Sequence, residues 1–141
     1  MNYLADEAKQ LLAELTPQTD RATLVTLSGE LGAGKTTLVQ QLAAHLGVRE
    51  PVTSPTFVLA KVYTLPEGPY ERLVHIDAYR LSSGNELTPL GFSKLMEDPK
   101  NLIVLEWPEQ VKDTLPVSDR ALHIELAADG TRAVTEMAGR V

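Results

Sequence analysis

The spacing of apolar residues divides the first third of the chain into a helix, a strand and a second helix. Residues 4–15 carry leucine and alanine at helical spacing with two acids in the first turn, which predicts an amphipathic helix that ends at Thr16-Pro17. The apolar, β-branched run Ala22–Ser28 predicts a buried strand. Lys35–Leu46, which ends before Gly47, predicts a helix. A glycine-rich turn joins this strand to this helix.

The rest of the chain is mostly extended. The stretch 50–56, with two prolines and three hydroxyl side chains, predicts a loop. A weakly helical segment, Asn85–Asp98, is broken at Pro89–Gly91. The tail 121–138 alternates apolar and polar residues around Asp129-Gly130, which predicts a β-hairpin. Three further strands are predicted: Phe57–Tyr63, Leu73–Asp77 and Leu102–Leu105.

This order of elements predicts the fold class. Strands that alternate with helices favour a three-layer α/β fold with a mainly parallel sheet, to which the C-terminal hairpin adds antiparallel strands. The length of 141 residues fits a single domain, residues 1–141. Of the known α/β folds, the strand, glycine-rich turn and helix favour that of the P-loop NTPases.

Charge and composition exclude several functions. The net charge of −6 disfavours direct binding to nucleic acid or to an anionic membrane, because both need a basic surface. There are no cysteines, and the three histidines lie far apart in sequence, so any metal is expected to have oxygen ligands. The chain has no stretch that predicts a membrane span or a signal peptide, so a cytoplasmic location is expected.

The strongest motif is the stretch Gly29–Thr36, GELGAGKT, which fits the pattern G-x-x-x-x-G-K-[ST] at every defined position. In that pattern the glycines allow backbone N–H groups to surround phosphates, Lys35 reaches the β- and γ-phosphate oxygens, and the Thr36 hydroxyl binds Mg²⁺. A plain glycine-rich turn before a helix is the alternative. The motif follows a predicted strand and precedes a predicted helix, as nucleotide binding requires, so the sequence predicts a nucleoside triphosphate site.

Two acids are candidates for the magnesium side of this site. Asp77 and Glu106 each end an apolar run that is predicted to be a strand. A P-loop enzyme needs an acid at the end of a neighbouring strand to hold the metal or its waters. For each acid the alternative is a charge at the solvent-exposed end of a strand. The sequence does not decide which of the two binds Mg²⁺ directly.

The nucleotide and the reaction are predicted from one missing motif and from the length of the chain. It has no Asn-Lys-x-Asp element to read guanine, so ATP is expected. A small-molecule kinase built on the same loop is one alternative to an ATPase, although 141 residues leave little chain for a lid and an acceptor site. A module that binds nucleotide without hydrolysing it is the other alternative.

Four motifs taken together, GELGAGKT, TSPTF, HIDAYRL and LEWPE, resemble in order and spacing the TsaE family. That family comprises small bacterial ATPases that assist threonylcarbamoyladenosine formation on tRNA. The resemblance covers about Ser28 to Glu109. Members usually begin with a short strand before the first helix, for which Met1–Ala5 leave almost no room, and Glu30 stands where Asp is frequent.

The resemblance implies a role for each matching residue. Asp77 would be a catalytic or magnesium-organising carboxylate, and Glu106 the magnesium-side acid. Trp107 would lie against the nucleotide, and Arg132 would reach its adenine side. Thr53–Thr56 would form a switch-like loop that senses the γ-phosphate, with Thr56 among the contacts. The residues that would surround the phosphates are Gly32, Ala33, Gly34, Lys35, Thr36 and Thr37.

The resemblance also implies cofactors and partners. ATP and Mg²⁺ would be bound, and hydrolysis would be slow without partners. The partners would be proteins of the TsaB and TsaD types, and ATP use would reset their complex between cycles of modification. Contact with tRNA would be indirect, through the other subunits, which the negative charge of this chain fits.

Overall fold

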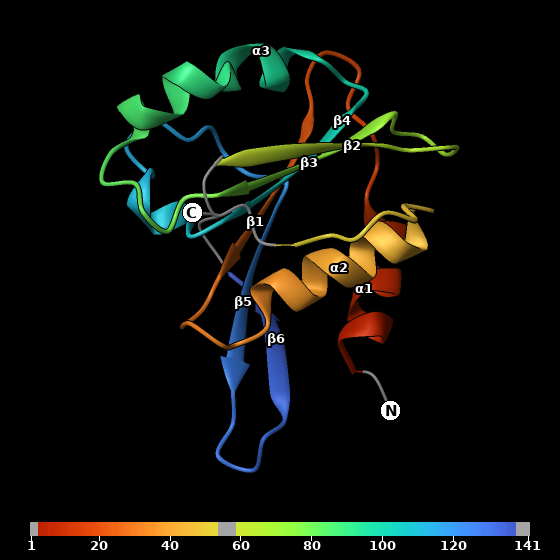
Figure 1. The fold of residues 1–141 in the computed structure, drawn as a ribbon, viewed down its shortest axis with the longest axis vertical. Coiled ribbons are helices and arrows are strands. Elements are labelled where there is room, and N and C mark those ends of the chain that lie inside the picture. Colours follow the sequence, from red (N-terminus) through yellow and green to blue (C-terminus); the bar gives the residue numbers. More distant parts are fainter. Residues whose placement is uncertain (1–2, 54–58, 138–141) are drawn as a thin grey trace.

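The computed structural model describes residues 3–53 and 59–137, and within them one six-stranded sheet forms the centre of the fold (Figure 1). The strands lie side by side in the order β2-β3-β4-β1-β5-β6. In chain order they are β1 (Thr23–Ser28), β2 (Ala60–Thr64), β3 (Arg72–Asp77), β4 (Asn101–Glu106), β5 (Arg120–Leu126) and β6 (Arg132–Glu136).

The sheet is mixed and mostly parallel. The four central strands β3, β4, β1 and β5 run parallel, and the edge strands β2 and β6 each pair antiparallel with their neighbours. Every residue of β1 and β4 is buried, as expected for parallel strands covered on both faces. The edge strand β6 is partly exposed. The predicted α/β class, the mostly parallel sheet and the C-terminal hairpin are confirmed.

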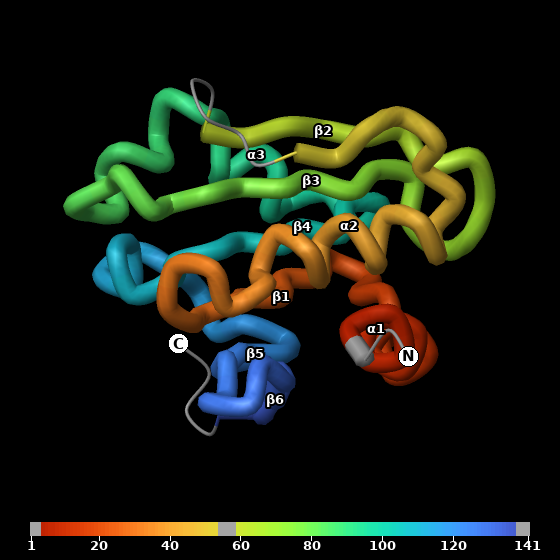
Figure 2. Tube along the Cα trace, turned by 60° about the horizontal axis from the view of Figure 1, so that its bottom comes forward, coloured from red at the N-terminus to blue at the C-terminus, as the bar shows by residue number. Residues whose placement is uncertain are grey.

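Helices pack on both faces of this sheet (Figure 2). Buried side chains of α1 and α2 form one core cluster with the sheet, and those of η1 and α3 form the second cluster on the opposite face. None of the helices in the described ranges is long and apolar enough to span a membrane. The helical elements are α1 (Tyr3–Glu14), α2 (Lys35–His45), α3 (Phe92–Glu97) and the 3-10 helices η1 (Gly84–Leu90) and η2 (Pro108–Gln110).

Strand alternation decides which side chains face α2. Along β4, Leu102 and Val104 belong to the cluster under α1 and α2, whereas Ile103 and Leu105 belong to the other cluster. Because side chains alternate along a strand, Glu106 lies on the α2 face. Since β1, β3 and β4 are parallel, their carboxyl ends share one edge, which is also the edge where β1 leads into the loop before α2.

Most predicted element boundaries lie within one or two residues of the observed ones, and two regions differ in other ways. The predicted strand Phe57–Tyr63 corresponds to β2, Ala60–Thr64, and its first two residues lie outside the described ranges. The break predicted at Pro89–Gly91 is a single residue: Gly91 adopts a φ of 71°, which ends η1 and begins α3. Pro89 itself lies inside η1.

One carboxylate ties the start of β1 to the entry of β5. Asp119 accepts the backbone N–H of Leu24 at 2.8 Å, and the N–H of Asp119 donates to the carbonyl of Leu24, also at 2.8 Å. The same carboxylate accepts two hydrogen bonds from the guanidinium of Arg21, at 2.9 and 3.0 Å. This arrangement sets the position of β5 beside the strand that carries the glycine-rich loop.

Replacing Asp119 is expected to destabilise the protein. Asp119→Ala leaves the buried N–H of Leu24 without its acceptor, which should lower the free energy of unfolding by about 2 kcal/mol. The matched control is Glu71→Gln, which removes the exposed ion pair with Lys100 and should cost about 0.5 kcal/mol. Urea unfolding of both variants measures the difference. Equal effects would show that Asp119 has no special role.

Candidate functional site

The loop of residues 29–34 connects β1 to α2 through glycines that no other residue replaces without strain. Gly29 has a φ of 144°, and a Cβ there would lie 2.4 Å from the carbonyl oxygen of Ile124. Gly34 has a φ of 113° and is the N-cap residue of α2, with no side-chain cap among the described residues. The first N–H groups of α2 are therefore available to an anion at the positive end of the helix dipole.

Lys35 is buried at the base of this loop, with 5% of its surface exposed. Its ammonium donates to the carbonyl oxygens of Gly29 and Glu30, at 2.5 and 2.8 Å. Burial lowers the pKa of Lys35 from its ordinary value of 10.5, while the carboxylates of Glu106, Glu109 and Asp77 act in the opposite direction. A cation that is this poorly solvated interacts strongly with any phosphate that reaches it.

Glu106 meets the start of α2 from the end of β4. The Thr36 hydroxyl donates to its carboxylate, with oxygen–oxygen distances of 3.0 and 3.3 Å. A second partner of the carboxylate is His75, whose Nε2 lies 2.5 Å from Oε2. Glu106 is only 2% exposed, so it is not a charge at the solvent-exposed end of a strand.

Asp77 lies beside Glu106, because the two are partners in the register of β3 and β4. It is less buried than Glu106, and its Oδ1 accepts the backbone N–H of Tyr79 at 3.0 Å. Among the described residues, no group of three or more histidine or acidic side chains could hold a metal ion by itself. Mg²⁺ does not need one, because it keeps several waters and takes few protein oxygens beside those of a phosphate.

Trp107 follows Glu106 with an unusual backbone. Its φ of 62° and ψ of 52° are left-handed, and in the described ranges it is the one non-glycine residue with a positive φ. Its N–H donates to the carbonyl of Leu27 at 3.0 Å. The ring lies 4.2 Å from the Lys35 ammonium, within the range of a cation–π interaction, and its centroid is 4.9 Å from that of the Tyr79 ring.

Arg132 comes to the loop from β6. Its Nε donates to the carbonyl oxygen of Ala33 at 2.8 Å, a contact between residues 99 positions apart in the chain. Thr56 lies outside the described ranges, so its predicted contact with the γ-phosphate stays a prediction. A cavity of about 180 Å³ is lined by Gly32, Gly34, Lys35, Thr36, Thr37, Glu106 and Arg132.

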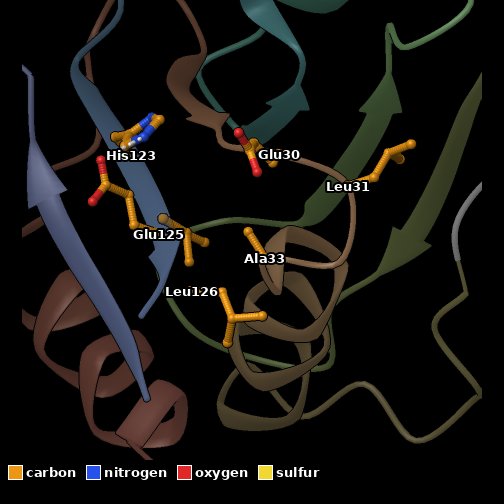
Figure 3. A pocket seen from close by; sticks show the side chains of 7 residues that line it. Glu30, Leu31, Ala33, His123, Glu125 and Leu126 are labelled. Carbon is orange, nitrogen blue, oxygen red and sulfur yellow. Dashed lines mark ion pairs between the residues drawn. The ribbon is translucent and has the colours of Figure 1, made fainter. Parts of the chain in front are cut away.

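A larger cavity of about 410 Å³ lies between the loop and the end of β5 (Figure 3). The loop contributes Glu30, Leu31 and Ala33 to its lining, and β5 contributes residues 123–126. Two of its lining residues, Glu30 and Glu125, are acidic, and Nε2 of His123, which also lines the cavity, lies 3.3 Å from Oε1 of Glu125. Because carboxylates repel phosphate, the smaller cavity beside Lys35 and Arg132 is the better anion site.

The structure brings together residues that the sequence singled out separately. The Thr36 hydroxyl is hydrogen-bonded to Glu106, and both residues line the same cavity as Lys35. Arg132 reaches the same loop through the carbonyl of Ala33. His75 was not predicted as part of the site. Period-2 alternation could have identified it, because it stands two positions before Asp77 and therefore faces α2 as well.

A mostly parallel α/β sheet whose central strand leads through GELGAGKT into a helix defines the class of α/β proteins with a phosphate-binding-loop motif. Within that class, the family model described as "Threonylcarbamoyl adenosine biosynthesis protein TsaE" matches residues 4–134. The chain therefore belongs to the TsaE family, a family of tRNA threonylcarbamoyladenosine biosynthesis.

Individual relatives agree with this assignment. Proteins named tRNA threonylcarbamoyladenosine biosynthesis protein TsaE are 49% identical in Streptomyces coelicolor, over 79% of this chain and 77% of that protein, and 35% identical in Mycobacterium tuberculosis, over 96% and 83%. The crystal structure of YdiB from Bacillus subtilis matches with a TM-score of 0.69 and 28% identity, over 95% of this chain and 80% of that one.

The buried position of Lys35 predicts how the affinity of this site for a phosphate ligand depends on pH, with ATP as the probe. The protonated amine attracts phosphate, so ATP affinity should fall as pH rises through the pKa of Lys35, which burial holds below 10.5. The fall should therefore begin at a lower pH than for an ordinary lysine. Equilibrium ATP titrations between about pH 7 and 10 measure it. Lys35→Met should bind weakly with no such decline, and a flat profile in the unmodified protein would contradict the prediction.

Proposed function

We propose that the chain is a single-domain, three-layer P-loop ATPase that binds ATP with Mg²⁺ and hydrolyses it to ADP and phosphate. One observation carries the proposal: the Thr36 hydroxyl and the Glu106 carboxylate, 70 residues apart in sequence, are hydrogen-bonded to each other beside the buried ammonium of Lys35. This is the combination of cation, hydroxyl and acid that a magnesium nucleotide requires.

The residues fit a magnesium ion. Both groups in contact, the hydroxyl of Thr36 and the carboxylate of Glu106, offer oxygen atoms, which Mg²⁺ prefers. Glu106 is favoured over Asp77 as the magnesium-side acid because it touches Thr36 directly. When bound, Mg²⁺ would neutralise charge on the β- and γ-phosphates.

Binding is assigned to the loop and to the start of α2. The residues that would surround the phosphates are Gly32, Ala33, Gly34, Lys35, Thr36 and Thr37. On binding, the Lys35 ammonium exchanges its bonds to the carbonyls of Gly29 and Glu30 for phosphate oxygens. This exchange keeps the buried cation paired throughout.

Hydrolysis is assigned to the groups around the γ-phosphate. Asp77, next to Glu106 in the sheet, orients the attacking water, while Lys35 stabilises the charge that develops on the leaving phosphate oxygens. Trp107 and Arg132 flank the nucleotide, Arg132 on its adenine side, and Thr56 senses the γ-phosphate. Turnover is slow in the isolated protein and rises when a partner completes the site.

In the cell we assign this ATPase to the cytoplasm, where it works with proteins of the TsaB and TsaD types. The family and the names of the relatives support a place in tRNA threonylcarbamoyladenosine biosynthesis. With a net charge of −6 the chain is a poor binder of tRNA, so the other subunits hold the tRNA. ATP use resets the complex between cycles.

Substitution of the two central residues tests the ATPase. Lys35→Ala should lower both ATP affinity and hydrolysis, and Glu106→Gln should lower hydrolysis by about 100-fold or more while metal-free ATP binding is kept. Glu125→Gln, in the neighbouring cavity, is the control and should stay within about threefold of the unmodified protein. Phosphate release in ATP, Mg²⁺ and water alone is the measurement. Release that needs an added acceptor would indicate a kinase.

Reconstitution tests the role in the pathway. The chain is mixed with TsaB, TsaD, tRNA and threonylcarbamoyl-adenylate, and modified tRNA is counted per complex. Without the chain we expect a single cycle of product, and with it many cycles, because ATP use would reset the complex. The Lys35→Ala variant is the matched control and should support a single cycle only. Many cycles without the chain would contradict this role.

A further inference from the structure

His75 is a polar side chain in a position that packing alone would give to an apolar one. It lies in β3 between Val74 and Ile76, and its side chain is 0% exposed. Alternation along β3 puts it on the same face as Leu73, which belongs to the core cluster under α2. A buried imidazole lowers stability unless hydrogen bonds replace the water that it loses.

The imidazole has one such bond among the described residues. Its Nε2 lies 2.5 Å from Oε2 of Glu106, and its buried Nδ1 has no hydrogen-bond partner in the described part of the chain. This geometry assigns the proton to Nε2, since the opposite tautomer would set two lone pairs against each other and leave an N–H without an acceptor. Within the described part of the chain, Glu106 is therefore the one hydrogen-bond partner of this ring.

The Glu106 carboxylate accepts hydrogen bonds from two side chains, Thr36 and His75, and the two differ in what happens when a ligand binds. The Thr36 hydroxyl is the one that the proposed function assigns to Mg²⁺, so it turns from the carboxylate when a magnesium nucleotide binds. The proposed function assigns His75 no contact with the nucleotide or the metal, so its hydrogen bond to Glu106 is kept. The strand register makes that bond rigid, because His75 pairs with Val104 and Asp77 with Glu106 on adjacent parallel strands.

We propose that His75 is a positioning residue for the magnesium site: its Nε2–H holds Oε2 of Glu106 and so fixes the orientation of the carboxylate, whose Oε2 and Oε1 lie 3.0 and 3.3 Å from the Thr36 hydroxyl. The inference rests on the proposed function. It is distinct from a packing role, which an apolar side chain of similar size would fill without an unpaired nitrogen. Partners that orient a metal-ligating carboxylate in this way typically change metal affinity or activity by about 10- to 100-fold when they are removed.

Two substitutions, His75→Asn and His75→Gln, distinguish the effect of an N–H donor at the position of Nε2 from the effect of any polar side chain at residue 75. The Gln amide nitrogen can reach the position of Nε2, whereas the Asn amide is too short. His75→Asn should raise the Mg²⁺ concentration for half-maximal ATP hydrolysis by about 10-fold or more and leave metal-free ATP affinity within about twofold. His75→Gln should restore the Mg²⁺ dependence to within about threefold of the unmodified protein.

Leu73→Ala is the matched structural control. It removes buried volume from the same strand and the same face, so it should lower the unfolding temperature. The Mg²⁺ dependence should stay unchanged, because Glu106 keeps both donors. Should His75→Asn fail to fold, His75→Met, which has no N–H donor in its side chain, replaces it in every measurement.

A readout in metal-free protein complements these assays. In a double-mutant cycle, His75→Asn and Glu106→Gln are combined and unfolded with urea, and the two effects should not add, because the side chains touch. The Mg²⁺ effect of His75→Asn should also vanish in the Glu106→Gln background.

Three results would overturn the inference: an unchanged Mg²⁺ dependence in His75→Asn, full additivity with Glu106→Gln, or equal loss in His75→Asn and His75→Gln. If the unmodified protein hydrolyses no ATP, the proposed function fails, and the inference is then decided by the Mg²⁺ dependence of ADP affinity and by the metal-free cycle.

Discussion

The site depends on the contact between Thr36 at the start of α2 and Glu106 at the end of β4. That contact exists because β1 and β4 are parallel neighbours, so the strand that leads into the loop and the strand that carries the acid end at the same edge of the sheet. An antiparallel pairing would send the acid to the opposite edge. Burying Glu106 lowers stability unless its charge is matched, and the hydroxyl of Thr36 and the imidazole of His75 supply the hydrogen bonds.

Several features of the site reduce stability and are consistent with a functional reason for their presence. Lys35 is a buried cation whose pKa burial lowers, and its bonds to two loop carbonyls are its protein partners in the site. Trp107 adopts a left-handed backbone that non-glycine residues rarely take. Both features put a charge and an aromatic ring next to the cavity, and both would be unnecessary if the loop were only a turn between a strand and a helix.

Membership of the TsaE family gives this local chemistry a biological setting. The negative net charge agrees with the proposed division of labour, in which this chain binds nucleotide and other proteins bind tRNA. The neighbouring cavity beside β5 differs in its charged residues: its lining includes Glu30 and Glu125, whereas the lining of the smaller cavity includes Lys35 and Arg132, so phosphate is disfavoured in the larger one. The sign of the charge, more than the size of the cavity, therefore distinguishes the two spaces.

By itself, the sequence determined the loop, its flanking strand and helix, the hairpin and the two candidate acids, because each depends on the spacing of residue types within a short segment of the chain. The tertiary structure decided which acid is buried against Thr36, that Arg132 reaches Ala33, that Trp107 turns back over Lys35 and that His75 belongs to the site. The contact between His75 and Glu106 joins residues 31 positions apart, and the contact between Arg132 and Ala33 joins residues 99 positions apart. Local periodicity carries no information on such pairs, since strand order and register, which depend on packing of the whole sheet, bring them together.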